Sequence, residues 1–121
     1  MRFRPGQHLR RQRDIRAVRQ QGSRLDCRAF TIWWTAKDGG TAPPRACFVA
    51  SIQAVGKAVL RNRAKRRMRE VFRRHQNLLP RSCDLLLVAR SSANQWPFAQ
   101  LERTFAEACG RMLSRPSPGS P

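Results

Sequence analysis

The first part of the chain has the apolar spacing of a helix. Between residues 9 and 20, Leu9, Ile15 and Val18 recur at helical intervals among arginine and glutamine residues. Gly22 follows, and glycine commonly ends a helix. The pattern therefore predicts a basic first helix that ends just before Gly22.

Residues 28–35 alternate in the manner of a β-strand. One side of this strand would carry Phe30, Ile32 and Trp34, and the other would carry Thr31 and Trp33. Aromatic and β-branched residues suit a pleated, half-buried surface. We expect Phe30 and Trp34 to pack in the core. For Trp33, on the opposite face, core packing and a binding surface are the two alternatives.

The rest of the pattern predicts further strands and a final helix. Gly-Gly and Pro-Pro pairs make residues 37–44 a loop before a second strand over residues 45–51, whereas residues 23–26 are too few to decide whether they form another strand. A continuous apolar run over residues 83–89 predicts a strand buried on both faces. The last helix is expected from Trp96-Pro97 to Leu113, on i+3/i+4 apolar spacing.

The helix predicted over residues 57–75 is amphipathic and strongly basic. Its apolar stripe comprises Ala64, Met68, Val71 and Phe72. Nine Lys and Arg residues between Lys57 and Arg74 are opposed by a single acid, Glu70, which gives a formal charge of +8. One acid cannot neutralise this charge, so the segment predicts an external polyanion, and nucleic acid is the candidate. Because it lies between two apolar strands, this helix is also expected to connect parallel strands.

Composition extends the basic character to the whole surface. The 121 residues include 25 Lys and Arg against 7 Asp and Glu, a net charge of +18. Only three of the basic residues are lysines, and the planar fork of arginine suits phosphates and bases. This favours structured RNA over a lipid surface. With no apolar run long enough for a membrane span or signal peptide, we expect a single-domain cytoplasmic protein.

The chain has few residues suited to chemistry of its own. The intervals between Cys27, Cys47, Cys83 and Cys109 exclude Cys-x-x-Cys pairs, so reduced thiols are expected, with disulfides in a secreted protein as the alternative. His8 and His75 could act as the acid and base of a nuclease, with Lys65 or an arginine stabilising the phosphorane. Each histidine lies among arginines, which favours surface placement. The scattered acids predict no metal site in the protein.

The amino-acid sequence of the basic helix resembles that of the bacterial ribonuclease P protein subunit. The matching positions of the helix are Arg61, Asn62, Arg63, Lys65, Arg66 and Arg69. The same family has a glycine after its first helix (Gly22), an Arg-x-Phe strand (Arg28 and Phe30), a second strand beginning with arginine (Arg45) and an Asp-apolar-Ala-Arg strand (residues 84–90). The resemblance implies an α+β domain over residues 1–113, an α-β-β-β-α-β-α sandwich with a left-handed βαβ crossover. Residues 114–121 would form a disordered tail.

The resemblance also implies the function. The protein would bind the catalytic RNA of ribonuclease P and the 5′ leader of precursor tRNA, and so assist endonucleolytic hydrolysis that yields the mature tRNA 5′ end. The RNA would carry the chemistry with Mg²⁺ that it holds itself, and the protein would supply no catalytic residue. The expected RNA-binding residues are Lys57, Arg61, Asn62, Arg63, Lys65, Arg66, Arg69 and Arg73, and the expected leader cleft comprises Ile15, Arg19, Trp33 and Arg90.

Some positions depart from the pattern of the family. Ile15 and Arg19 stand where relatives often have two aromatic residues, so leader binding is expected to depend more on charge and on Trp33. Ile52 and Gln53 replace two residues that are commonly basic. The alternative function is that of a general basic RNA-binding or ribosomal-type protein with no role in cleavage. This alternative does not predict the Arg-Asn-Arg motif.

Overall fold

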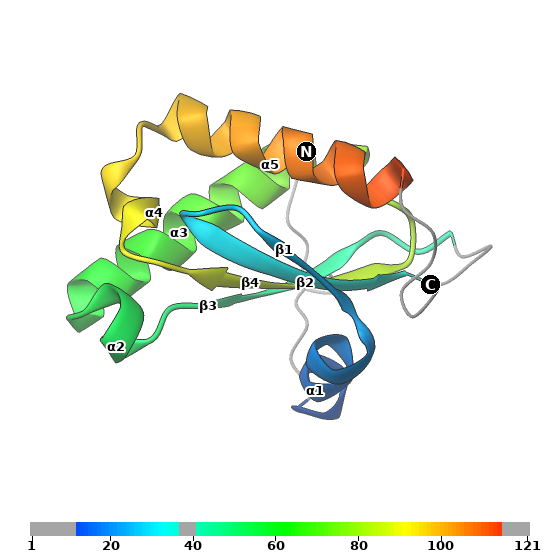
Figure 1. Cartoon of the computed structure of the whole chain (residues 1–121), viewed down its shortest axis with the longest axis horizontal. Coiled ribbons are helices and arrows are strands. Elements are labelled where there is room, and N and C mark those ends of the chain that lie inside the picture. Colours follow the sequence, from blue (N-terminus) through cyan, green and yellow to red (C-terminus); the bar gives the residue numbers. More distant parts are fainter. Residues whose placement is uncertain (1–11, 37–40, 115–121) are drawn as a thin grey trace.

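The structure is a computed structural model that describes residues 12–36 and 41–114. Within these residues, four strands and five α-helices follow one another (Figure 1). Their order is α1 (Gln12–Gln21), β1 (Ser23–Asp26), β2 (Phe30–Ala36), β3 (Arg45–Val49), α2 (Ile52–Val55), α3 (Ala58–His75), the 3₁₀ turn η2 (Gln76–Leu78), β4 (Cys83–Ala89), α4 (Ser92–Gln95) and α5 (Phe98–Ser114).

The strands form one mixed sheet in the order β1-β2-β4-β3. Strands β1 and β2, and β2 and β4, pair antiparallel, while β3 and β4 pair parallel across helix α3. The crossover predicted from the apolar runs is therefore confirmed. Residues 23–26, which the sequence left undecided, form a strand in which Arg24 pairs with Trp33.

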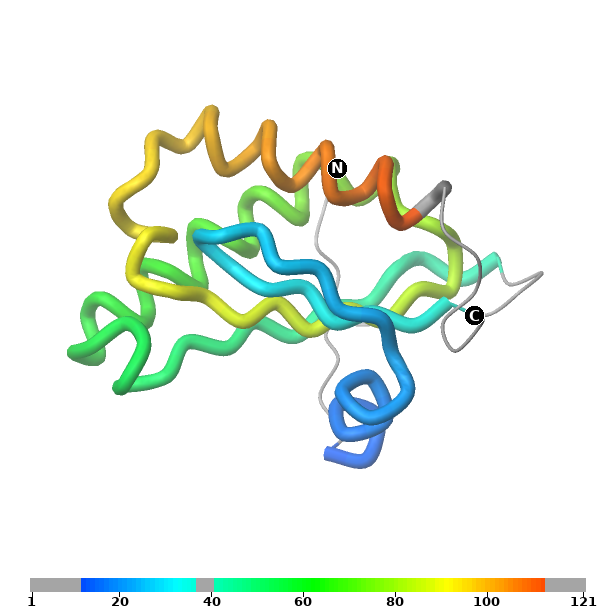
Figure 2. Tube along the Cα trace, in the orientation of Figure 1, coloured from blue at the N-terminus to red at the C-terminus, as the bar shows by residue number. Residues whose placement is uncertain are grey.

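The two faces of the sheet are covered differently. Helices α3 and α5 lie on one face and α1 lies on the other (Figures 1 and 2). The α3/α5 face contains the main core, where Phe30 and Trp34 pack with Phe72 and Phe105. The predicted assignment of Phe30 and Trp34 to the core is confirmed. Trp33 lies on the opposite face, which we call the α1 face, and stays partly exposed.

Two short helices were not predicted, and several boundaries differ. Helix α2 forms because the Ser51 hydroxyl accepts a hydrogen bond from the Ala54 N–H at 3.0 Å, and it ends at Gly56, where φ is +109°. Strand β2 begins at Phe30 because Arg28, with φ +68°, lies in a turn. Helix α5 begins at Phe98 instead of Trp96 and includes Ser114. The predicted start of the first helix at Leu9 and the rest of the predicted tail lie outside the described residues.

Candidate nucleic-acid interface

Helix α3 packs along one stripe and leaves its cations on the outside. Ala64, Met68, Val71 and Phe72 are at most 1% exposed. The predicted RNA-binding residues Lys57, Arg61, Asn62, Arg63, Lys65, Arg66, Arg69 and Arg73 are all exposed or half-buried. Within residues 12–36 and 41–114, the side chains of Asn62, Arg63, Lys65 and Arg66 make no hydrogen bond or ion pair. These donors are therefore available to an external anion.

Other arginines of α3 are already bound within the fold. Arg67 donates to the Ala93 carbonyl at 2.9 Å and to the Trp96 carbonyl, which fixes α4 against α3. Arg73 and Arg74 both pair with Glu70, and hydrogen bonding by Arg73 is the main reason why the pKa of Glu70 falls to about 2. Arg73, one of the predicted RNA contacts, is thus partly neutralised by the helix itself.

The basic side of α3 lies beside the sheet edge formed by β3. The guanidinium of Arg69 lies 5.7 Å from the ring centroid of Phe48, and Phe48 contacts Phe72 edge to face with centroids 5.9 Å apart. The preceding residue, Cys47, is on the α1 face. Burial raises the pKa of its thiol, and the nearby charge of Lys65 partly opposes this rise. Positive charge on α3 is therefore close to the edge of the α1 face.

Trp33 is the aromatic centre of the α1 face. It packs beside Val18 of α1 and Leu86 of β4, both 1% exposed, while its own side chain is only partly buried. The guanidinium groups of Arg19 and Arg24 each lie 5.7 Å from the centroid of its ring system. Ile15 belongs to the same cluster, so three of the four residues predicted for the cleft are brought together. Arg24 also contacts Trp33 and was not among the predicted cleft residues, because the pattern of residues 23–26 was too brief to interpret.

Arg90, the fourth predicted cleft residue, lies at the end of β4 and is held by neighbouring groups. Its guanidinium pairs with Asp26 at 3.1 Å and donates to the Thr31 hydroxyl at 3.1 Å. The hydrogen bond from the Arg28 N–H contributes most to lowering the pKa of Asp26, and the contact with Arg90 lowers it further. Arg90 is thus bound to β1 through Asp26 and to β2 through Thr31.

Arg45 holds α1 against the sheet. It donates two hydrogen bonds of 2.8 Å to the Asp84 carboxylate, and its guanidinium is 4.0 Å from the Asp14 carboxylate of α1. The bidentate contact with Asp84 raises the pKa of Arg45. These contacts help to fix α1, with Ile15 and Val18, beside Trp33. The sequence marked Arg45 only as the first residue of a strand.

The histidines and cysteines offer no assembled catalytic group in the described part of the chain. His75 bonds Glu102 at 3.1 Å, while His8, its candidate partner, lies outside the described residues. All four cysteines are free, and burial raises the pKa of Cys27 to about 11 and that of Cys109 to about 12. These thiols are protonated at neutral pH and unreactive.

Comparison with known proteins decides the family. The family model of ribonuclease P matches residues 3–113. The chain belongs to the ribonuclease P protein family. The ribonuclease P protein component of Acidothermus cellulolyticus is 32% identical over 104 residues, which cover 86% of each chain. That of Thermobifida fusca is 32% identical over 118 residues, covering 93% of this chain and 79% of the relative. The resemblance based on the Arg-Asn-Arg helix is confirmed.

Solved ribonuclease P proteins share the fold. The protein from Staphylococcus aureus aligns with a TM-score of 0.71 at 22% identity, over 89% of this chain and 95% of that one. The protein from Thermotoga maritima aligns with a TM-score of 0.72 at 24% identity, over 86% and 96% respectively. The predicted α+β class is therefore confirmed. As a ribonuclease P protein component of bacterial type, the chain is part of an endoribonuclease complex with an RNA partner.

One prediction concerned membranes. Across the part of the chain that the structure describes, no helix combines the length and the apolar composition needed to cross a bilayer.

Proposed function

We propose that this ribonuclease P protein docks onto a catalytic RNA through α3 and guides the 5′ leader of precursor tRNA along the α1 face. The observation that carries the proposal is the row of unpaired donors on α3, Asn62, Arg63, Lys65 and Arg66, held by a buried apolar stripe. Folded RNA concentrates phosphates that a rigid cationic face can neutralise. A helix fixed to a sheet loses little conformational freedom when it binds such a surface.

The α1 face suits a single strand better than a duplex. Its centre is one partly exposed indole with two guanidinium groups close to it, those of Arg19 and Arg24. Single-stranded nucleic acid is bound by this combination of stacking platform and positive charge. Ile15 would add an apolar contact beside Trp33, and Arg90 would add charge at the end of the α1 face.

The RNA is the proposed site of catalysis and of Mg²⁺ binding. Within the described ranges, no three His, Cys, Asp or Glu side chains come together in a group that could hold a metal ion. The carboxylates of Asp14, Asp26, Glu70, Asp84 and Glu102 each lie in an ion pair with an arginine instead. The carboxylates of the described residues therefore do not fit a Mg²⁺ site, and the contribution proposed for the protein is to bind and orient RNA.

Reconstitution is the direct test of this division of labour. We expect the protein alone to leave precursor tRNA uncut and to increase cleavage when a bacterial ribonuclease P RNA is present at low Mg²⁺. The reason is that bound arginines replace some of the cations that the RNA complex otherwise requires. Cleavage is measured by the release of the 5′ leader. Cutting by the protein alone, lost on His75→Ala, would instead make the chain a nuclease.

Trp33→Ala is expected to weaken binding of precursor tRNA by about tenfold and to leave mature tRNA nearly unaffected, because one base stack contributes ~1–3 kcal/mol. The measurement is the dissociation constant of the reconstituted complex for substrates with and without a leader. Trp33→Phe, which keeps an aromatic ring beside Arg19 and Arg24, is the matched control and should retain most of the preference. Equal losses on both RNAs would remove Trp33 from the leader path.

A further inference from the structure

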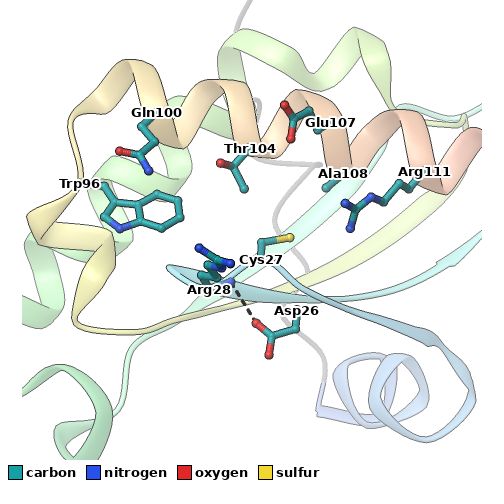
Figure 3. A pocket seen from close by; sticks show the side chains of 9 residues that line it. All are labelled: Asp26, Cys27, Arg28, Trp96, Gln100, Thr104, Glu107, Ala108 and Arg111. Carbon is teal, nitrogen blue, oxygen red and sulfur yellow. Dashed lines mark hydrogen bonds between the residues drawn. The ribbon is translucent and has the colours of Figure 1, made fainter.

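A pocket lies between the β1–β2 turn and helix α5, outside the α3 surface and beyond the end of the α1 face (Figure 3). Its volume is about 260 Å³, slightly below the ~300–1,000 Å³ of sites that enclose a whole small molecule. The site therefore suits one unit of a longer molecule. Its lining includes Asp26, Arg28, Trp96, Gln100, Thr104 and Arg111.

Arg28 reaches this pocket from a strained turn. The Ala29 N–H donates to the Cys27 carbonyl at 2.8 Å, which closes a three-residue turn with φ +68° at Arg28. Glycine adopts such a φ with less strain than any residue that has a Cβ. The guanidinium lies in the space beneath the indole of Trp96 (Figure 3). Among the described residues its side chain makes no hydrogen bond or ion pair.

The indole of Trp96 is fixed by its backbone. The Trp96 carbonyl accepts a hydrogen bond from Arg67 of α3, and its N–H donates to the Ser92 carbonyl at 2.9 Å. The indole packs partly on the main core and is otherwise exposed to the pocket. Gln100 and Thr104 extend from the next two turns of α5 along the same wall. An aromatic plane, a cation and neutral hydrogen-bonding groups thus surround one small space.

We propose that this pocket binds one unpaired nucleotide of RNA. The base would stack on Trp96, the phosphate would contact Arg28, and Gln100 and Thr104 would meet the polar edge of the base. The carboxylates of Asp26 and Glu107 also line the pocket, so a singly charged phosphodiester fits better than a free, multiply charged phosphate. That the ligand is RNA rests on the proposed function.

The position of the pocket connects it to the leader path. Asp26, which lines the pocket, pairs with Arg90 at the end of the α1 face. A single strand that leaves the α1 face can therefore pass around the β1–β2 turn and place a nucleotide beside Trp96. An unpaired nucleotide of the catalytic RNA would satisfy the same chemistry, and the experiment below distinguishes the two sources.

Arg28→Gly is the decisive variant, because it removes the guanidinium and relieves the turn. Binding of hexauridylate and hexaadenylate RNA is measured as a function of salt, with the Trp96 indole N–H signal followed by NMR. We expect affinity to fall about fivefold at 0.1 M salt and the slope of log K against log salt to fall by ~0.7, the value of one phosphate contact with a single strand. Thermal stability should not decrease. Arg103→Ala, which removes an exposed arginine of α5 outside the pocket, should change none of these.

Two further variants and two RNA arms complete the test. Trp96→Leu should lose about tenfold in affinity and Trp96→Phe much less, as expected for a stacking platform. If Arg28→Gly lowers only the affinity of the reconstituted complex for precursor tRNA, the nucleotide belongs to the leader. If Arg28→Gly instead lowers the affinity of the protein for the catalytic RNA, the nucleotide belongs to that RNA. Either result supports the pocket.

The contrary outcomes are distinct. An unchanged salt slope in Arg28→Gly, or an unmoved Trp96 indole signal while that of Trp33 shifts, overturns the pocket and leaves the proposed function standing. If AMP binds as tightly as the hexanucleotides, the ligand of the pocket is a free mononucleotide, and the assignment of the pocket to RNA is overturned. If neither indole responds to any RNA, the proposed function fails as well.

Discussion

Replacing Arg63 and Arg66 with alanine is expected to weaken binding to the catalytic RNA by roughly 25- to 60-fold at 0.1 M salt. Both side chains are exposed on α3, and neither is bound within the described part of the fold. Each phosphate contact contributes ~0.7–0.9 to the salt slope, so the loss of two should lower the slope by roughly 1.4–1.8. Filter binding or fluorescence anisotropy at several salt concentrations measures both quantities. Alanine is the strongest helix former, so α3 itself should not be weakened.

The matched control for this pair is Arg81→Ala with Arg103→Ala. Both control residues are exposed and lie outside α3, and each double variant lowers the net charge of +18 by two. If binding depends only on total charge, the two double variants will lose affinity equally. A loss confined to Arg63 and Arg66 identifies α3 as the docking surface. Equal losses would favour a general basic RNA-binding protein instead.

The sequence predicted α3 well because two independent signals coincide there. The helical period of Ala64, Met68, Val71 and Phe72 determines which side packs, and the surplus of arginine determines what the other side can bind. The strand over residues 83–89 was equally clear, because a strand covered on both faces has a nearly continuous apolar run. Strong local patterns of this kind depend little on the rest of the fold.

The sequence could not show which arginines are already bound. Arg66, Arg67 and Arg73 look alike in the run, yet Arg66 is unpaired within the described residues, Arg67 anchors α4, and Arg73 pairs with Glu70. The partners of Arg67 are 26 and 29 residues away along the chain, so no local pattern reports them. The pairing of Arg24 with Trp33 likewise depends on the register of a four-residue strand. A one-residue shift in that register would place Arg24 on the other face.

Gly22→Ala is expected to destabilise the fold by about 3 kcal/mol, at the upper end of overpacking costs, and to lower the melting temperature by roughly 10 °C. The sequence predicted Gly22 as a helix stop, and the helix does end at Gln21, but the only described glycine with positive φ is Gly56. Gly22 is needed for space instead. An added Cβ would lie 2.3 Å from the Val18 carbonyl oxygen and 2.6 Å from that of Trp34, and neither backbone atom can move independently.

The same substitution should separate the two proposed surfaces. Relief of the contact with the Trp34 carbonyl requires the end of α1 to move away from β2, which would shift α1 relative to Trp33 while α3 stays in place on the opposite face. We therefore expect Gly22→Ala to reduce the preference for RNA with a leader more than it reduces docking to the catalytic RNA, measured below the melting temperature. Gly110→Ala is the matched control: its added Cβ meets nothing within 4 Å, and it should stabilise α5 by about 0.5–1 kcal/mol. A Gly22→Ala protein that melts like Gly110→Ala would mean that α1 is not held at this distance, and the proposed leader path would then lack a fixed helix beside Trp33.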